Sequence, residues 1–153
     1  MDTTNKNISE YNAIIKENED VYRGIAKAFG LSDCTFWILY TLREVDEKLT
    51  QSDICEVIYL PKQTVNSALK KLENSGHIKL APLKDRRSKE ITLTKSGIDL
   101  AEKTVDKVIA VENKAFAGLG TDEQSVLISL FRKYTDLLKE SIGALKAANG
   151  ETK

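Results

Sequence analysis

The sequence predicts a mainly α-helical fold with one small β-hairpin, in which a compact central lobe is flanked by long helices. Three observations lead to this prediction. Apolar residues recur at helical spacing through most of the chain. Two short stretches, residues 77 to 83 and 89 to 94, alternate as β-strands do. The turn between them, from Lys84 to Lys89, carries four basic side chains although the formal net charge of the chain is zero.

The first long helix is expected over residues 8 to 29, because apolar side chains return every three or four positions and Gly30 follows as a stop signal. A second helix is expected to begin after Ser32, a good N-cap, and to reach Val45. This helix is apolar nearly all round, which indicates that it packs between other elements. Its two stripes are Ile38, Leu39, Leu42 and Val45, and Phe36, Trp37 and Tyr40.

Two short helices joined by a tight turn are expected next. Thr50 and Asp53 resemble a capping box at the start of a helix over residues 51 to 58. Pro61 fits the first position of a fourth helix, which is expected to end at Gly76. Three helices followed by a two-stranded hairpin, in this order, form a winged helix-turn-helix, which we assign to residues 31–94.

Long helices are expected on either side of this lobe, over residues 8–30 and 95–146. Thr94 is expected to cap a helix that runs to about Phe116, and Thr121 with Gln124 suggests a capping box for the last helix. These outer helices carry more apolar surface than a monomer can easily cover. We therefore expect a second copy of the chain to cover the rest, and interpret them as dimerisation helices.

The charges of the chain are segregated along the sequence. Residues 1 to 60 hold six basic and eleven acidic side chains, residues 61 to 90 hold eight and three, and residues 91 to 153 hold nine of each. A basic central segment inside an acidic chain is a local electrostatic footprint for nucleic acid.

The composition argues against several other classes of protein. The sequence suggests neither a membrane span nor a secretion signal, so we expect a cytoplasmic protein. Cys34, Cys55 and His77 do not form a disulfide framework or a metal-ligand pattern. Because paired catalytic groups and a glycine-rich phosphate loop are also missing, we expect no enzyme activity, no cofactor and no metal.

The fourth helix has the pattern of a recognition helix. Val65, Ala68, Leu69 and Leu72 fall on one stripe that would pack inward. The opposite arc is short, polar and basic, and such side chains suit direct readout in a major groove. An ordinary solvated face is the simpler alternative for the same arc. The candidate DNA contacts of this helix are Lys62, Gln63, Thr64, Asn66, Ser67 and Lys70.

The segment "DRRSKEITLTKSG" resembles the wing motif of the MarR (multiple antibiotic resistance regulator) family. The matching positions are Asp85, Arg87, Ile91, Leu93, Thr94 and Gly97. The order of elements from residue 8 to about residue 145 is also similar to that family. The resemblance implies a homodimeric transcriptional regulator, usually a repressor, that binds a pseudo-palindromic operator in double-stranded DNA.

The resemblance also implies how the wing contacts DNA. The wing would lie along the phosphate backbone, with Arg87, or Arg86 beside it, reaching into the minor groove. Asp85 would orient Arg87 or hold the turn, and Lys84 and Lys89 would add contacts to phosphates. A winged-helix module that binds only proteins is the alternative function. It would explain the fold, but it would not need the two arginines at the tip.

Aromatic side chains suggest a sensor site, because members of this family respond to small molecules. The stripe on the second helix, together with the first helix, could line a site for an aromatic or phenolic ligand, or it could be ordinary core. The candidate ligand-binding residues are Tyr11, Tyr22, Arg23, Phe36, Trp37 and Tyr40. Cys34 lies at a helix start, which favours a reactive thiolate, but Asp33 opposes ionisation, and a buried, unreactive cysteine is the alternative.

Overall fold

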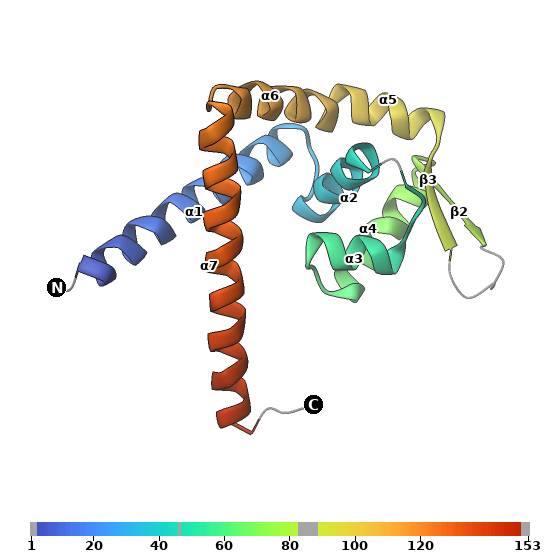
Figure 1. Cartoon of the computed structure of the whole chain (residues 1–153). Coiled ribbons are helices and arrows are strands. Elements are labelled where there is room, and N and C mark those ends of the chain that lie inside the picture. Colours follow the sequence, from blue (N-terminus) through green and yellow to red (C-terminus); the bar gives the residue numbers. More distant parts are fainter. Residues whose placement is uncertain (1–2, 46, 83–88, 151–153) are drawn as a thin grey trace. The chain divides into compact units, whose positions relative to one another are not determined.

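The computed structural model describes residues 3–45, 47–82 and 89–150. The chain forms two compact units, one up to Ile109 and the other from Ala110 onward. The mainly helical fold with a small antiparallel sheet is confirmed. The elements of the first unit are α1 (Thr3–Ala28), α2 (Asp33–Glu44), β1 (Leu49–Thr50), α3 (Gln51–Ile58), α4 (Lys62–Asn74), β2 (Ile78–Pro82), β3 (Lys89–Leu93) and α5 (Lys95–Lys103), followed by the start of α6 (Val105–Ala117) (Figure 1).

The sheet has three strands rather than the expected two. Its strand order is β1-β3-β2, and both pairings are antiparallel. The third strand is the short β1, in which Leu49 pairs with Ile91 and Thr50 pairs with Glu90. Two residues are too few to show an alternating pattern, so β1 carries no sequence signal of its own.

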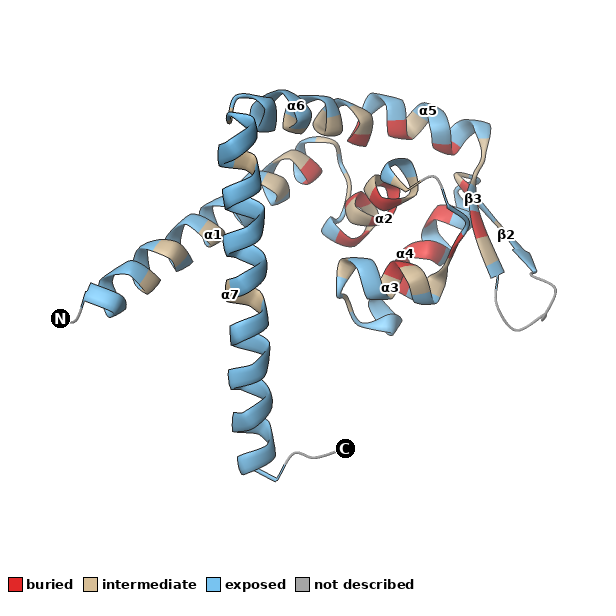
Figure 2. Cartoon of the chain, viewed as in Figure 1, coloured by how far each residue is buried: buried red, intermediate tan, exposed pale blue. Residues whose placement is uncertain are grey.

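The core of the first unit lies where α2, α3, α4 and the sheet meet (Figure 2). Phe36, Ile38 and Leu39 of α2 are completely buried. The inward stripe predicted for α4 is confirmed, because Val65, Ala68, Leu69 and Leu72 are all buried. The winged helix-turn-helix is therefore held together by the apolar stripes that the sequence indicates, with α2 at its centre.

The helix caps agree with the sequence in three places. The hydroxyls of Ser32, Thr50 and Thr94 each accept the backbone N–H three residues later, at the starts of α2, α3 and α5. At α4 the prediction is wrong by one residue, because Pro61 is the N-cap and Lys62 is the first helical residue. Helix α1 begins at Thr3, earlier than the expected Ile8, since polar residues can extend a helix without an apolar stripe.

The helix expected from residue 95 to about residue 116 is interrupted. Helix α5 ends at Lys103 and α6 begins at Val105, with Thr104 between them at φ −125° and ψ −91°. Neither glycine nor proline marks this break. The sequence prediction of one continuous helix is therefore wrong at Thr104.

The second unit consists of the end of α6 and the long helix α7 (Thr121–Ala148). The expected capping box of Thr121 and Gln124 is wrong, because the N-cap is Gly120, whose N–H donates to Glu123 Oε2 at 2.8 Å. Gln124 Nε2 instead donates to the carbonyls of Phe116 and Leu119, both at 2.9 Å, and so closes the turn.

Helix α7 exposes much apolar surface (Figure 2). Nine of its large apolar side chains are between 43% and 60% exposed: Val126, Leu127, Ile128, Leu130, Phe131, Leu137, Leu138, Ile142 and Leu145. No helix in the described part of the chain is long and apolar enough to cross a membrane.

Candidate nucleic-acid interface

Helix α4 presents one polar arc to solvent. All six side chains that the sequence marks on this helix are exposed, whereas the residues between them are buried in the core: the exposed ones are Lys62, Gln63, Thr64, Asn66, Ser67 and Lys70. The Ser67 hydroxyl donates to the carbonyl oxygen of Gln63 at 2.9 Å. The arc therefore has the size, exposure and chemistry that a major groove accepts.

The amino end of α4 adds positive character to this arc. Pro61 supplies no side-chain hydrogen bond to the first turn, and that turn holds no acidic residue. The positive end of the helix dipole is therefore not compensated by a side-chain cap or by a carboxylate in the first turn. Lys62 places a full positive charge at the same end.

A hollow beside α4 brings the helix and the hairpin together. It has a volume of about 250 Å³ and is lined by Gln51, Asn66, Leu69, Lys70, Glu73, Leu80 and Lys89. Asn66 and Lys70 of α4 and Lys89 of the hairpin thus border one concave surface. Gln51 was not predicted, although its place in the first turn of α3, after the Thr50 cap, is a usable signal.

The hairpin is described only in part. Lys89 is exposed at the start of β3, where it pairs with Pro82 of β2. The other predicted contacts of the wing, Lys84, Asp85, Arg86 and Arg87, lie outside the described residues.

The end of the wing motif has a structural explanation. The Thr94 hydroxyl donates to the carbonyl oxygen of Gly76 at 2.6 Å and accepts the N–H of Gly97 at 3.1 Å. The backbone N–H of Thr94 donates to the carbonyl oxygen of His77 at 3.0 Å. Thr94 therefore joins the end of α4, the sheet and the start of α5, and so fixes the hairpin relative to α4. The His77 side chain also contacts α5, since its Nδ1 lies 3.0 Å from Ser96 Oγ.

The turn of the helix-turn-helix is built on Tyr59. This residue has φ +53° and ψ 33°, the left-handed conformation that glycine or asparagine usually supplies, and it is the only non-glycine residue with positive φ in the described part of the chain. Its side chain is 83% exposed. The flanking Ile58 and Leu60 are partly buried and pack against the core.

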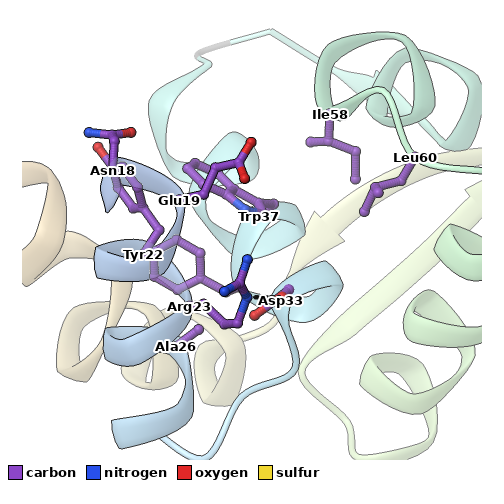
Figure 3. Close-up of a pocket in the computed structure, with 10 residues that line it drawn as sticks. Asn18, Glu19, Tyr22, Arg23, Ala26, Asp33, Trp37, Ile58 and Leu60 are labelled. Carbon is purple, nitrogen blue, oxygen red and sulfur yellow. Dashed lines mark ion pairs between the residues drawn. The ribbon is translucent and has the colours of Figure 1, made fainter. Parts of the chain in front are cut away.

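A cavity lies on the other side of this turn, between α1 and α2 (Figure 3). Its volume is about 320 Å³, and its walls are Asn18, Glu19, Tyr22, Arg23, Ala26, Asp33, Phe36, Trp37, Ile58 and Leu60. Of the six residues that the sequence suggests for a ligand, Tyr22, Arg23, Phe36 and Trp37 line the cavity. Tyr40 instead packs on Trp37, with ring centroids 5.3 Å apart, and Tyr11 is not part of the walls.

The remaining lining residues were missed by the sequence reasoning. Asn18 and Glu19 lie one helical turn before Tyr22 and Arg23, so helical spacing could have identified them. Ile58 ends α3 and Leu60 lies in the turn before α4, and only the folded chain shows that these two residues reach α1 and α2.

Cys34 lies in a setting that disfavours the reactive thiolate. Its side chain is buried, burial raises the pKa of its thiol, and the nearby Cys55 raises that pKa further. The Cys34 thiol also lies 3.8 Å from the carbonyl oxygen of Thr64 on α4. Among the described residues, no group of three or more histidine, cysteine or carboxylate side chains could hold a metal ion.

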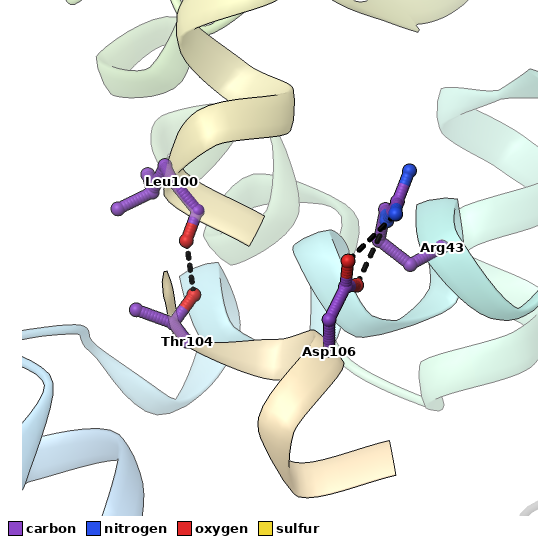
Figure 4. A network of polar contacts seen from close by, with 4 residues as sticks. All are labelled: Arg43, Leu100, Thr104 and Asp106. Atoms are coloured by element: carbon purple, nitrogen blue, oxygen red, sulfur yellow. Dashed lines mark hydrogen bonds and ion pairs between the residues drawn. The ribbon is translucent and has the colours of Figure 1, made fainter. Parts of the chain in front are cut away.

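The junction of α5 and α6 is tied to α2 (Figure 4). The Thr104 hydroxyl donates to the carbonyl oxygen of Leu100 at 2.7 Å, and thereby satisfies the carbonyl that the interrupted helix would leave open. Two residues later, Asp106 accepts two hydrogen bonds from Arg43, at 2.8 and 2.6 Å. This bidentate pair attaches the first turn of α6 to the last turn of α2.

Sequence comparisons relate this chain to helix-turn-helix transcriptional regulators. The model of the MarR family matches residues 29–88, which include α2, α3, α4 and β2. The HTH-type transcriptional regulator PecS from Dickeya dadantii is 30% identical over 114 residues, which cover 71% of this chain and 69% of PecS.

Solved structures of similar proteins cover nearly the whole chain. NMB1585, a MarR family regulator from Neisseria meningitidis, is 26% identical and has a TM-score of 0.76, with 94% of this chain and 99% of that chain covered. The fold is also shared with MepR from S. aureus, solved in complex with DNA, at 24% identity, a TM-score of 0.66 and coverage of 85% and 96%. BpsR from Bordetella bronchiseptica, whose DNA binding is regulated by 6-hydroxynicotinic acid, has 20% identity, a TM-score of 0.61 and coverage of 82% and 98%.

Proposed function

This chain belongs to the MarR family of DNA-binding transcriptional regulators, and we propose that it is a homodimeric repressor whose operator binding responds to a small aromatic molecule. The family consists of regulators and not of enzymes. The observation that carries the proposal is the exposed polar arc of α4, which borders one hollow together with Lys89 of the hairpin.

Helix α4 would read sequence and the wing would hold the protein on DNA. Gln63 and Asn66 can each form the bidentate hydrogen bonds that identify adenine, whereas Lys62 and Lys70 reach guanine or phosphate. The wing residues Lys84 to Arg87 and Lys89 would contact the backbone and the minor groove, with Asp85 orienting Arg87. Sequence preference would therefore reside mainly in α4 and affinity for any DNA mainly in the wing.

The apolar stripe of α7 supports a homodimer. Nine large apolar side chains exposed on one helix are far more than scattered surface residues, and such a patch marks an interface. We assign residues 8–30 and 95–146 to this interface and residues 31–94 to the DNA-binding lobe. A two-fold dimer would place its two α4 helices in successive major grooves, so the operator would be a pseudo-palindrome.

The cavity between α1 and α2 supports a ligand response, because two of its lining residues immediately precede α4 in the chain. Ile58 and Leu60 line the cavity, and Leu60 is followed by Pro61, the N-cap of α4. A ligand that displaces these side chains would change the angle at which α4 leaves the turn. An angle that no longer fits the major groove would weaken DNA binding, and linkage requires that DNA then weaken ligand binding by the same factor.

Selection of operators from random DNA, followed by fluorescence anisotropy and light scattering, tests the proposal. We expect a pseudo-palindromic site with half-sites about 10 base pairs apart, and a particle with twice the chain mass. A monomer that binds all sequences equally would contradict the proposal. Repression is tested with a reporter gene behind the selected operator, where deletion of the regulator should raise expression.

A further inference from the structure

The cavity between α1 and α2 has an aromatic wall. The Trp37 ring lies 5.0 Å from the ring of Tyr22 and 5.1 Å from that of Phe36, measured between ring centroids. Phe36 is completely buried behind them. The Trp37 ring is inclined by 46° to that of Tyr22 and by 84° to that of Phe36, so the wall is angled and not flat. A planar ligand can stack on one of these rings, and the negative face of an aromatic ring attracts a positive charge.

The charged side chains that line the cavity are negative on balance, like the ring faces. Glu19 and Asp33 bring two carboxylates to the walls, and Arg23 is the one cation among the described residues that line it. That cation is already shared between two carboxylates, since Arg23 lies 3.1 Å from Asp20 and 3.9 Å from Asp33. In Figure 3 the Arg23 guanidinium turns toward Asp33, while the Glu19 side chain leads from α1 toward Trp37.

Of the two carboxylates in the cavity walls, only Asp33 forms an ion pair with a described residue, and Glu19 does not. The described part of the chain offers it no ion-pair partner. An anion entering the cavity would meet this carboxylate and would have to compete with Asp20 and Asp33 for Arg23. A cation would gain from Glu19 and from the face of Trp37 at the same time.

We propose that this cavity binds a planar aromatic cation, such as a quaternary heteroaromatic nitrogen compound or a protonated aromatic amine. The inference rests on the proposed ligand response and assigns the chemical class of its ligand. The aromatic part of the ligand lies against Trp37 and Tyr22, and the positive charge faces Glu19. The apolar lining residues Ala26, Ile58 and Leu60 contact the remaining surface. The volume of about 320 Å³ accommodates two or three fused rings.

The test uses two ions of similar size and shape but opposite charge. N-methylquinolinium and 2-naphthoate are titrated into the full chain by isothermal calorimetry. We expect N-methylquinolinium to bind more tightly. The variant Arg23→Gln removes the lining cation and releases Asp33, so it should raise affinity for N-methylquinolinium about two- to fivefold. If the cavity were an anion-binding site, the same variant would lower affinity for 2-naphthoate. The direction in which Arg23→Gln changes affinity therefore distinguishes a cation site from an anion site.

Two matched variants control for long-range charge. Lys27→Gln removes a cation from α1 outside the cavity walls and should change affinity for either ion little, because exposed charges are screened. Glu19→Gln should weaken N-methylquinolinium binding about two- to fivefold, whereas Glu17→Gln on the same helix should not. Near-UV spectra of all four variants report whether the fold is retained.

Tighter binding of 2-naphthoate, lost in Arg23→Gln, would overturn the assignment of a cation site and leave the proposed ligand response intact. Absence of binding by both ions would also overturn it. A different result would contradict the proposed ligand response: ions that bind in the cavity but leave the affinity for the operator unchanged.

Discussion

Gly97 lies directly against the carbonyl oxygen of His77, in the space that a Cβ atom at position 97 would occupy. The obstacle is backbone, and it is held in place because the same carbonyl accepts the N–H of Thr94 at 3.0 Å. The glycine of the wing motif is therefore required by a close approach of two backbone segments, where β2 begins and α5 begins. Its φ is not positive, so conformational freedom is not the reason.

Substitution Gly97→Ala should lower the free energy of unfolding by about 3 kcal/mol, because neither backbone segment can move without breaking the Thr94 hydrogen bonds. The measurement is urea denaturation followed by circular dichroism. Gly24→Ala is the control, since nothing lies within 4 Å of a Cβ at position 24 and the residue is inside α1. That variant should be neutral or more stable by about 0.5–1 kcal/mol. Equal effects of both would contradict the role of the His77 carbonyl.

The Arg43–Asp106 pair should contribute measurably to stability. Its bidentate geometry, at 2.8 and 2.6 Å, and side-chain exposures of 32% and 26% distinguish it from fully exposed pairs. A double-mutant cycle with Arg43→Gln and Asp106→Asn should give a coupling energy of about 1 kcal/mol that decreases in 1 M salt. The pair Lys48–Glu90, in which Lys48 is 78% exposed, is the control and should give less.

The cap of α3 should make stability depend on acid pH. The backbone N–H and hydroxyl of Thr50 both donate to Asp53 Oδ2 at 2.7 Å, and these hydrogen bonds lower the pKa of Asp53 below its ordinary value. Because the folded state holds the carboxylate ionised, this contribution is present above about pH 4 and is lost as pH falls through the lowered pKa. Asp53→Asn should therefore cost about 1 kcal/mol at pH 7, and this cost should decrease steadily as the pH falls below about 4, as measured by urea denaturation.

Cys34 should be a poor oxidant sensor. Burial raises the pKa of its thiol, so the thiolate is scarce at neutral pH and access to it is restricted. In the Cys55→Ser variant, the remaining thiol should react with a disulfide reagent at least 10-fold more slowly than a free cysteine. Cys34→Ser should leave any response of DNA binding to peroxide unchanged. Loss of that response in Cys34→Ser would reverse this assignment.

Mutations should distinguish the residues that recognise base sequence from those that hold the protein on the DNA backbone. Asn66→Ala should cost about 1–3 kcal/mol on the cognate operator and much less on random DNA, because a bidentate contact to a base carries sequence information. Arg87→Ala should weaken binding to all sequences and reduce the slope of log K against log salt by about 0.9 for each lost phosphate contact. Anisotropy titrations at several salt concentrations measure both. The opposite pattern would mean that α4 does not lie in the major groove.

Local sequence patterns predicted most of this fold, because the helix starts and the buried helix faces are determined by residues close together in the sequence. Thr50 and Asp53 are three residues apart and define the start of α3 without help from the rest of the chain. The inward stripe of α4 follows from helical periodicity alone. The wing motif was identified in the same way, since Thr94 and Gly97 are close in sequence even though their partner His77 is not.

The features that sequence reasoning missed depend on distant residues. Strand β1 exists because Leu49 and Thr50 pair with Ile91 and Glu90, about 40 residues away. The break at Thr104 is stabilised by its hydroxyl, and threonine side chains are common in unbroken helices too. The cavity combines α1, α2 and the turn at Ile58, so its acidic character could not be read from the aromatic stripe of α2 alone.

The hydrogen bond from Ser67 to Gln63 restricts what Ser67 can recognise. The hydroxyl proton is directed at the Gln63 carbonyl oxygen, 2.9 Å away, so the face of the hydroxyl that points outward offers lone pairs only. In the proposed interface Ser67 would therefore accept hydrogen bonds from the exocyclic amino groups of adenine or cytosine. It would be repelled by guanine O6 and N7, by thymine O4 and by phosphate oxygens. In the proposed interface, this one intrahelical bond would make Ser67 distinguish bases by the polarity of their edges.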